Sequence, residues 1–349
     1  MANTKIVELM AAPVDSRDLS WLQESLQAAV ELEFSTLPIY LSGMWSIKEQ
    51  NGEVYNLINS VVLEEMLHLG FACNMLKAIG GTPKIVAPTY PGHLPGGVLP
   101  DLDVYLGGLN SKTVEMYMAI EEPENPLALA EPDYPTIGMF YDAIRELFQT
   151  LSPSISTDEQ LTATLRVPNP DGSGATIPEP LTILTSLDDV LAAIKTIKDQ
   201  GEGTANSPDS PEFGGELAHY YRFGEIHYGK KFVEVDGSWR YAGDPVPFPD
   251  CYPVSRVPQG GYPDLPASKS FNIAYSQLIA GLQDAWAGGG QSSLGTAIKI
   301  MGELYSLAAP IIATPLPDGT VVSRSFVGNV RLPAERGSEV VQVKLSLST

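Results

Sequence analysis

Basic residues are scarce in this chain of 349 residues: Lys and Arg number 21 against 42 Asp and Glu, giving a formal net charge of −21. Nucleic acids and anionic lipids are bound mainly through Lys and Arg, so this balance argues against both as partners. No apolar run reaches the roughly 18 residues that a membrane span needs. The first residues also lack the apolar stretch of a signal peptide. We therefore expect a cytoplasmic protein with no membrane or nucleic-acid partner.

Cysteine and histidine are scarce as well, with two Cys and four His. Cys73 and Cys251 alone form neither a disulfide framework nor a Cys-rich zinc site. The sequence has no glycine-rich phosphate loop and no Gly-x-Ser-x-Gly elbow, so nucleotide-cofactor and serine-hydrolase functions have no support. Gly and Pro, in contrast, number 32 and 29, and they gather in the middle of the chain.

Apolar residues recur at helical spacing in two parts of the chain, separated by this Pro- and Gly-rich stretch. The pattern predicts one mainly α domain over residues 1–310, a four-helix bundle with a loop-rich insertion at 81–215 between its second and third helices. Asp236-Gly237 predicts the turn of a small β-hairpin, and the tail 311–349 is expected to be strand or disordered. The expected bundle helices are 18–48, 53–79, 216–231 and 268–309, the last in two segments.

The first long helix carries two glutamates in different surroundings. On a helical wheel with Trp21 at zero, the apolar side chains fall between about 100° and 200°, and Glu33 lies among them at about 120°. Glu31 lies at about 280°, on the polar side. A carboxylate that points into a core is costly unless it is paired or bound to a metal. Glu33 is therefore a candidate ligand, and Glu31 is a solvated surface charge.

The second long helix places a Glu-x-x-His motif on its apolar side. With Asn56 at zero, Glu65 lies at about 180° and His68 at about 120°. A buried Glu–His hydrogen bond would explain one isolated pair. The segment ELAHYYRFGEIHYG repeats the motif with Glu216 and His219, so two of the four histidines follow it.

A glutamate from one helix together with Glu-x-x-His from two others is most of the set that holds two iron or manganese ions in ferritin-like bundles. The candidate metal ligands are therefore Glu33, Glu65, His68, Glu216 and His219. Carboxylate and imidazole ligands suit iron, with manganese or copper as alternatives. A full dinuclear set needs another Glu on a fourth helix, which the sequence does not clearly supply. A dinuclear and a mononuclear centre both remain open.

The segments that carry these residues also resemble a known family. LQAAVELEFSTLPIYL, VVLEEMLHLGFACNMLKAIGGTP and ELAHYYRFGEI are similar to the ferritin-like domain of iminophenyl-pyruvate dimer synthases, the chromopyrrolate-type synthases of bisindole pathways. YPGHLPGGV, TIGMFYDAI, KDQGEGT and DPVPFP extend the resemblance over most of residues 18–310. It implies a ferritin-like helical core with a metal site and the oxidative coupling of two aromatic imino acids, which much longer proteins carry out.

The resemblance supports the same five ligands and adds Glu225 as a weaker one, because the whole run HYYRFGEI is family-like. On the wheel, Glu225 faces away and lies three residues from Arg222, which favours a surface ion pair. The weaker candidates for a catalytic role are His227, Tyr40, Tyr220 and His93.

Together, these features predict an iron-dependent oxidase or oxygenase that uses dioxygen on a small aromatic or amino-acid-derived substrate. A homodimer is compatible with this reading. Two alternatives stay open. One is a non-catalytic metal-binding or storage protein, and the other is a structural relative without metal whose carboxylates pair with Arg or His.

Overall fold

A computed structural model gives the fold of the chain. The residues it describes are 5–123, 136–164, 166–168, 174–176, 180–201, 208–210, 216–262, 265–312, 314–316, 319–323 and 326. They form a mainly helical fold with small two-stranded antiparallel sheets, as the sequence predicts. No helix among these residues is both long enough and apolar enough to cross a lipid bilayer.

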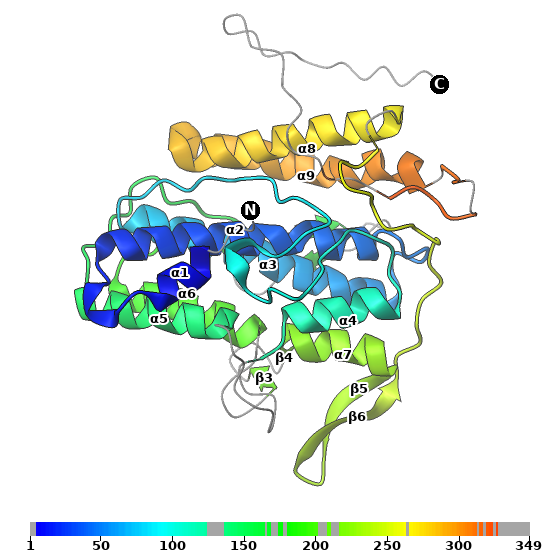
Figure 1. Ribbon diagram of the computed structural model, residues 1–349, viewed down its shortest axis with the longest axis horizontal. Helices are drawn as coiled ribbons and strands as arrows, with labels where there is room; N and C mark the ends of the chain where they lie inside the picture. The colour runs from blue at the N-terminus through cyan, green and yellow to red at the C-terminus, as the bar shows by residue number, and fades with distance from the viewer. Residues whose placement is uncertain are drawn as a thin grey trace, which may run out of the picture.

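Two long antiparallel helices, α2 (Leu19–Met44) and α3 (Glu53–Ala78), form the centre of the molecule (Figure 1). Asp18 caps α2 by accepting a hydrogen bond from the backbone N–H of Trp21 at 3.0 Å. Such a cap satisfies one of the free N–H groups at a helix start. Pro38 lies inside α2 and does not end it. Most residues of both helices are buried, which explains why they are apolar on nearly every side.

A second pair, α4 (Ser111–Ile120) and α7 (His219–Tyr228), packs against one face of α2 and α3. Asn110 begins α4 with a capping box that it forms with Thr113. Tyr117 then anchors α4 on α2, because its hydroxyl donates to the carbonyl of Ile39 at 3.0 Å and its ring packs against Tyr40. The α4 C-terminus is thereby fixed against the C-terminal half of α2.

Two further helices, α5 (Ile137–Leu151) and α6 (Leu187–Gly201), lie beside this pair and contact α2 and α3 (Figure 1). The short α1 (Lys5–Ala11) packs against α2, and single 3-10 turns occur at Val14–Ser16 and Pro95–Gly97.

The remaining helices, α8 (Pro266–Asp284) and α9 (Gly290–Ile312), form a hairpin joined by a π-helical turn at Ala285–Gly289. They lie on the other side of α2 and α3 from α4 and α7 (Figure 1). The segment expected at 268–309 as the fourth bundle helix is thus an outer layer. The structure places α4, from within the expected insertion, in the fourth position.

Short hairpins complete the fold. The strands β5 (Lys230–Val235) and β6 (Ser238–Pro245) pair around Asp236 and Gly237, as the sequence predicts. Both turn residues have positive φ, at 55° and 75°, the geometry that Asp-Gly supplies in a tight hairpin. The other pairs are β1 (Arg166–Pro168) with β2 (Gly174–Thr176) and β3 (Asp209–Ser210) with β4 (Glu216–Leu217). Most of the tail expected at 311–349 lies outside the described residues.

The contact between Gly43 and Tyr117 gives a test of how α4 is held. A Cβ at Gly43 would lie 2.2 Å from the Tyr117 hydroxyl, so Gly43→Ala should lower the free energy of unfolding by about 1–3 kcal/mol. Gly295 in α9 is the matched control, because a Cβ there meets nothing within 4 Å. Gly295→Ala should raise the stability by roughly 0.5–1 kcal/mol. Urea denaturation followed by circular dichroism measures both, and equal effects would contradict the packing described.

Candidate metal centre

Glu33 comes from α2, where it is buried among apolar neighbours and only 5% exposed. Tyr141 of α5 donates a hydrogen bond to its Oε1. Its other oxygen, Oε2, lies 3.7 Å from Nδ1 of His68. The carboxylate predicted from the wheel therefore does point into the core, and it meets a histidine there.

The Glu-x-x-His motif of α3 places Glu65 and His68 one helical turn apart on the same inner face. Nδ1 of His68 is 3.7 Å from Oε1 of Glu65, and both residues are buried. The opposite ring nitrogen, Nε2, lies 2.8 Å from the amide oxygen of Gln200. Thr36 donates to Oε2 of Glu65 at 2.7 Å. These contacts fix the orientation of both side chains.

His219 reaches the same carboxylate from α7. Its Nδ1 lies 2.9 Å from Oε1 of Glu65 and 3.5 Å from Oε2 of Glu121. Glu121 follows the last residue of α4 and is buried, and the hydroxyl of Tyr40 donates to its Oε1. Four helices thus deliver five possible ligands to one point in the interior.

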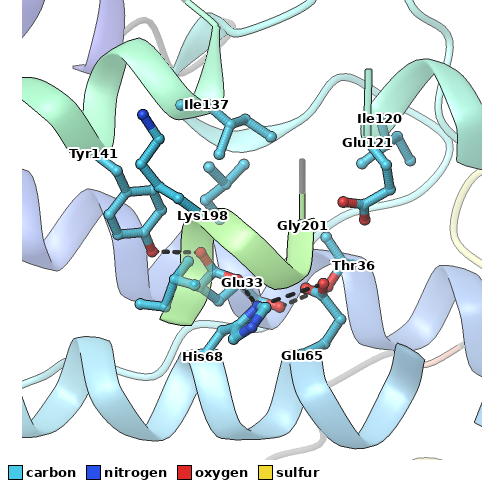
Figure 2. Close-up of a pocket in the computed structure, with 13 residues that line it drawn as sticks. Glu33, Thr36, Glu65, His68, Ile120, Glu121, Ile137, Tyr141, Lys198 and Gly201 are labelled. Atoms are coloured by element: carbon cyan, nitrogen blue, oxygen red, sulfur yellow. Dashed lines mark hydrogen bonds and ion pairs between the residues drawn. The ribbon is translucent and has the colours of Figure 1, made fainter. Parts of the chain in front are cut away.

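The five side chains form two groups that share one carboxylate. Glu33, Glu65 and His68 make the first group (Figure 2), and Glu65, Glu121 and His219 make the second. In each group the potential ligand atoms lie within 4.8 Å of one another. A small cavity of about 30 Å³ opens between Glu33, Glu65 and Glu121. Two neighbouring sites joined by a shared carboxylate have the arrangement of a dinuclear centre.

The comparisons with known proteins identify the family and the fold. A family described as Ferritin-like matches residues 26–228, which include all five candidate ligands and more than half of the chain. The chain belongs to the ferritin-like family. A ferritin-like protein from Caulobacter vibrioides, solved at 1.95 Å, has a similar fold, with a TM-score of 0.60 and 23% sequence identity over 88% of this chain and 99% of the other. No curated protein matches the chain.

One predicted ligand of this ferritin-like protein is not at the centre. Glu216 is exposed on β4, and its carboxylate lies 3.9 Å from Nη2 of Arg222. The reason is the start of α7: the helix begins at His219, with Ala218 as its N-cap. Glu216 therefore precedes the helix, and the three-residue spacing to His219 does not put the two side chains on one face.

The structure also corrects the expected pairing of Glu225 with Arg222. Glu225 is buried, but it accepts hydrogen bonds from the backbone N–H of Phe232 at 2.9 Å and from Nζ of Lys231 at 2.7 Å. It holds β5 against α7 and does not reach the metal centre. Arg222 is buried too and pairs with Glu64 of α3.

Of the weaker catalytic candidates, only Tyr40 touches the centre, through Glu121. His93 is exposed in a loop. His227 is partly buried near Glu115, at 4.0 Å, and Tyr220 packs on Tyr221. The ligand that sequence reasoning missed is Glu121. The sequence does indicate a helix that ends directly before Glu122-Pro123, but this pattern does not show which way the side chain of Glu121 points.

A buried ion pair between Glu64 and Arg222 lies on the side of His219 that faces away from Glu65. Nε2 of His219 lies 2.8 Å from Oε2 of Glu64, and Arg222 binds the same carboxylate through Nη2 at 2.7 Å and Nη1 at 3.1 Å. Burial acts to raise the pKa of Glu64, but Arg222 and His219 outweigh it and hold the pKa at about 2. An ionised Glu64 accepts a hydrogen bond from the Nε2–H of His219, which leaves Nδ1 free to bind a metal.

The centre itself carries an excess of negative charge. Burial, followed by the carboxylates of Glu121 and Glu33, raises the pKa of Glu65 to about 7, although His219 acts in the opposite direction. Burial lowers the pKa of His219, but the carboxylates of Glu121, Glu64 and Glu65 outweigh it and raise the pKa well above its usual value. Both shifts show that the pocket favours an additional positive charge.

A metal ion fits this requirement. Nδ1 of His219 is buried and has no hydrogen-bond partner of acceptable geometry in the described part of the chain, although carboxylate oxygens lie around it. A cation between these atoms would satisfy the nitrogen and the oxygens together. Carboxylate oxygens and imidazole nitrogens are the donors that iron and manganese take in ferritin-like bundles.

The pair of Glu64 and Arg222 gives a prediction for stability. Arg222→Met leaves a buried carboxylate without its partner and should lower the free energy of unfolding by about 3–5 kcal/mol in metal-free protein. The double variant Glu64→Gln with Arg222→Met should recover most of this loss. Arg240→Met is the control, because Arg240 forms an exposed pair with Asp236 and should cost at most about 1 kcal/mol. Equal losses of unfolding free energy in Arg222→Met and Arg240→Met would contradict the role given to Arg222.

Proposed function

We propose that this chain is a ferritin-like metalloprotein that binds two iron ions and uses them with dioxygen to oxidise a small aromatic or amino-acid-derived substrate. Two groups of ligands that share Glu65 carry the proposal. Glu33 and His68 would hold one ion, Glu121 and His219 the other, and Glu65 both. Iron bound there would supply the electrons that reduce dioxygen.

The residues around the ligands support a reactive site. Tyr141 and Tyr40 donate hydrogen bonds to Glu33 and Glu121, so each hydroxyl holds a ligand carboxylate in place. Burial is the main cause that raises the pKa of Tyr141 and of Tyr40, so both phenols keep their protons. The cavity beside them has apolar walls that include Leu32, Ile120, Ile137 and Ile197. Its volume of about 30 Å³ suits a molecule of the size of dioxygen.

Lys198 is the contact that we assign to an amino-acid-derived substrate. It lines the cavity together with the ligands (Figure 2), and its Nζ lies 2.5 Å from Asp142. An ammonium group beside the cavity would attract the carboxylate of such a substrate.

Metal content tests the ligand assignment. Protein purified without chelator should hold two iron or manganese ions per chain, and Glu65→Ala should lose nearly all metal because both sites share this carboxylate. Glu121→Ala should keep about one ion. Glu216→Ala is the matched control and should keep two. Inductively coupled plasma mass spectrometry measures all four. The assignment fails if the wild type holds no metal, or if Glu216→Ala loses as much as Glu65→Ala; the first result would favour a structural relative without metal.

Oxygen consumption tests the enzyme reading. The iron-loaded chain should consume dioxygen when given the imine of phenylpyruvate or indolepyruvate, and Glu65→Ala should not. Lys198→Met should raise KM about tenfold with a small change in kcat and with unchanged metal content, because a charged contact to bound substrate is lost. Lys195→Met is the control, since Lys195 lies on the same helix and does not line the cavity. Retention of many more than two irons per chain without substrate turnover would instead identify a storage protein.

A further inference from the structure

A second and larger cavity lies on the opposite side of α2 and α3 from the metal centre. It has a volume of about 300 Å³ and is enclosed by α2, α3, α8 and α9 (Figure 1 shows the two helix pairs). It shares no lining residue with the cavity at the metal centre. Each central helix therefore presents a different surface to each cavity: α3, for example, offers Glu65 and His68 to one and Met66 and Leu69 to the other.

The lining of this apolar cavity excludes charged ligands. No Asp, Glu, Lys, Arg or His is among its described lining residues. A charged group placed there would lose its hydration without gaining a partner. Aromatic rings are common in the lining and include Phe34, Trp45, Tyr275, Trp286 and Phe326. These rings offer flat faces on which another aromatic ring can stack.

Asn59 is a polar exception in this apolar cavity. It is 1% exposed, and neither atom of its side-chain amide has a hydrogen-bond partner among the described residues. The hydroxyl of Tyr275, which also lines the cavity, is buried and equally without a partner there. Asn74, deeper in α3, shows the usual situation, because its amide binds the backbone of Leu161 and accepts from Trp286.

A buried amide without partners is costly, so its presence beside a cavity requires an explanation. An amide offers one donor and one acceptor side by side, and Tyr275 offers a hydroxyl that can do either. A ligand with a neutral amide or hydroxyl group would satisfy the amide of Asn59 while its apolar part fills the remaining space.

We propose that the apolar cavity is a binding site for a neutral, flat aromatic molecule of two or three fused rings that carries one amide or hydroxyl group. The size follows from the volume, which is about twice the roughly 150 Å³ of an engineered cavity that holds benzene. Asn59 binds the polar group, and the aromatic rings of the lining contact the apolar part. The site is separate from the proposed metal chemistry and does not depend on it.

Binding of 2-naphthamide tests the proposal. Its addition to the full chain should quench the fluorescence of Trp45 and Trp286 with one molecule bound per chain, and isothermal titration calorimetry should give the same stoichiometry. 2-Ethylnaphthalene, which lacks the amide, should bind more weakly. Asn59→Leu should weaken 2-naphthamide binding about tenfold and change 2-ethylnaphthalene binding less than threefold. Asn56→Leu is the control, since Asn56 is exposed on the same helix.

A variant that blocks the cavity keeps the test independent of Asn59. Gly302 lines the cavity, and a Cβ there meets nothing within 4 Å. Gly302→Phe should weaken the binding of both probes at least tenfold, whereas Gly295→Phe, on the same helix but away from the cavity, should not. Thermal melting verifies that each variant is folded. Absence of saturable binding to the wild type would overturn the proposal, and so would 2-naphthamide binding that Asn59→Leu leaves unchanged.

Discussion

Burying three carboxylates at one point in an apolar interior is the constraint on which the rest of this structure depends. Glu33, Glu65 and Glu121 lie at the centre of the helical core, where their mutual repulsion and lost hydration are not balanced by an Arg or Lys bound to them in the described structure. The raised pKa values of Glu65 and His219 express the same need for positive charge. Protons meet this need in the metal-free chain, and metal ions would meet it with better geometry, because one ion can bind several oxygens and a nitrogen together.

Much of the surrounding architecture serves to hold these ligands. Arg222 keeps Glu64 ionised, and Glu64 in turn orients His219 so that Nδ1 faces the carboxylates. Gln200 holds His68 in a comparable way from α6. The two tyrosines that bind Glu33 and Glu121 come from α5 and α2, so five helices besides α7 take part in the site. A site built from so many elements is rigid, which suits chemistry that requires fixed ligand positions. The α8–α9 layer takes no part, and its side of the central helices is free to form a separate cavity.

The sequence predicted the helical fold and indicated four of the five side chains that meet at the centre. Glu33, Glu65 and His68 are polar residues on helix faces that are otherwise apolar, and a helical wheel detects that conflict. His219 was indicated by the repeated Glu-x-x-His motif. The sequence did not indicate Glu121 because this residue follows the last turn of a short helix. The direction of a side chain there depends on how Tyr117 packs α4 against α2. The prediction that Glu216 reaches the centre was wrong because periodicity does not locate the first residue of α7. The place of α8 and α9 was also beyond the sequence, since an amphipathic pattern shows that a face is buried and not what covers it.

Anomalous diffraction from crystals grown with iron or manganese is the most direct test of the central claim. The account predicts two peaks about 3.5–4 Å apart, one beside Glu33 and His68, the other beside Glu121 and His219, with the carboxylate of Glu65 between them. A single peak bound by only one of the two groups would contradict the dinuclear centre. Crystals with no peak, in which His219 is paired directly with the carboxylates, would contradict the metal centre altogether.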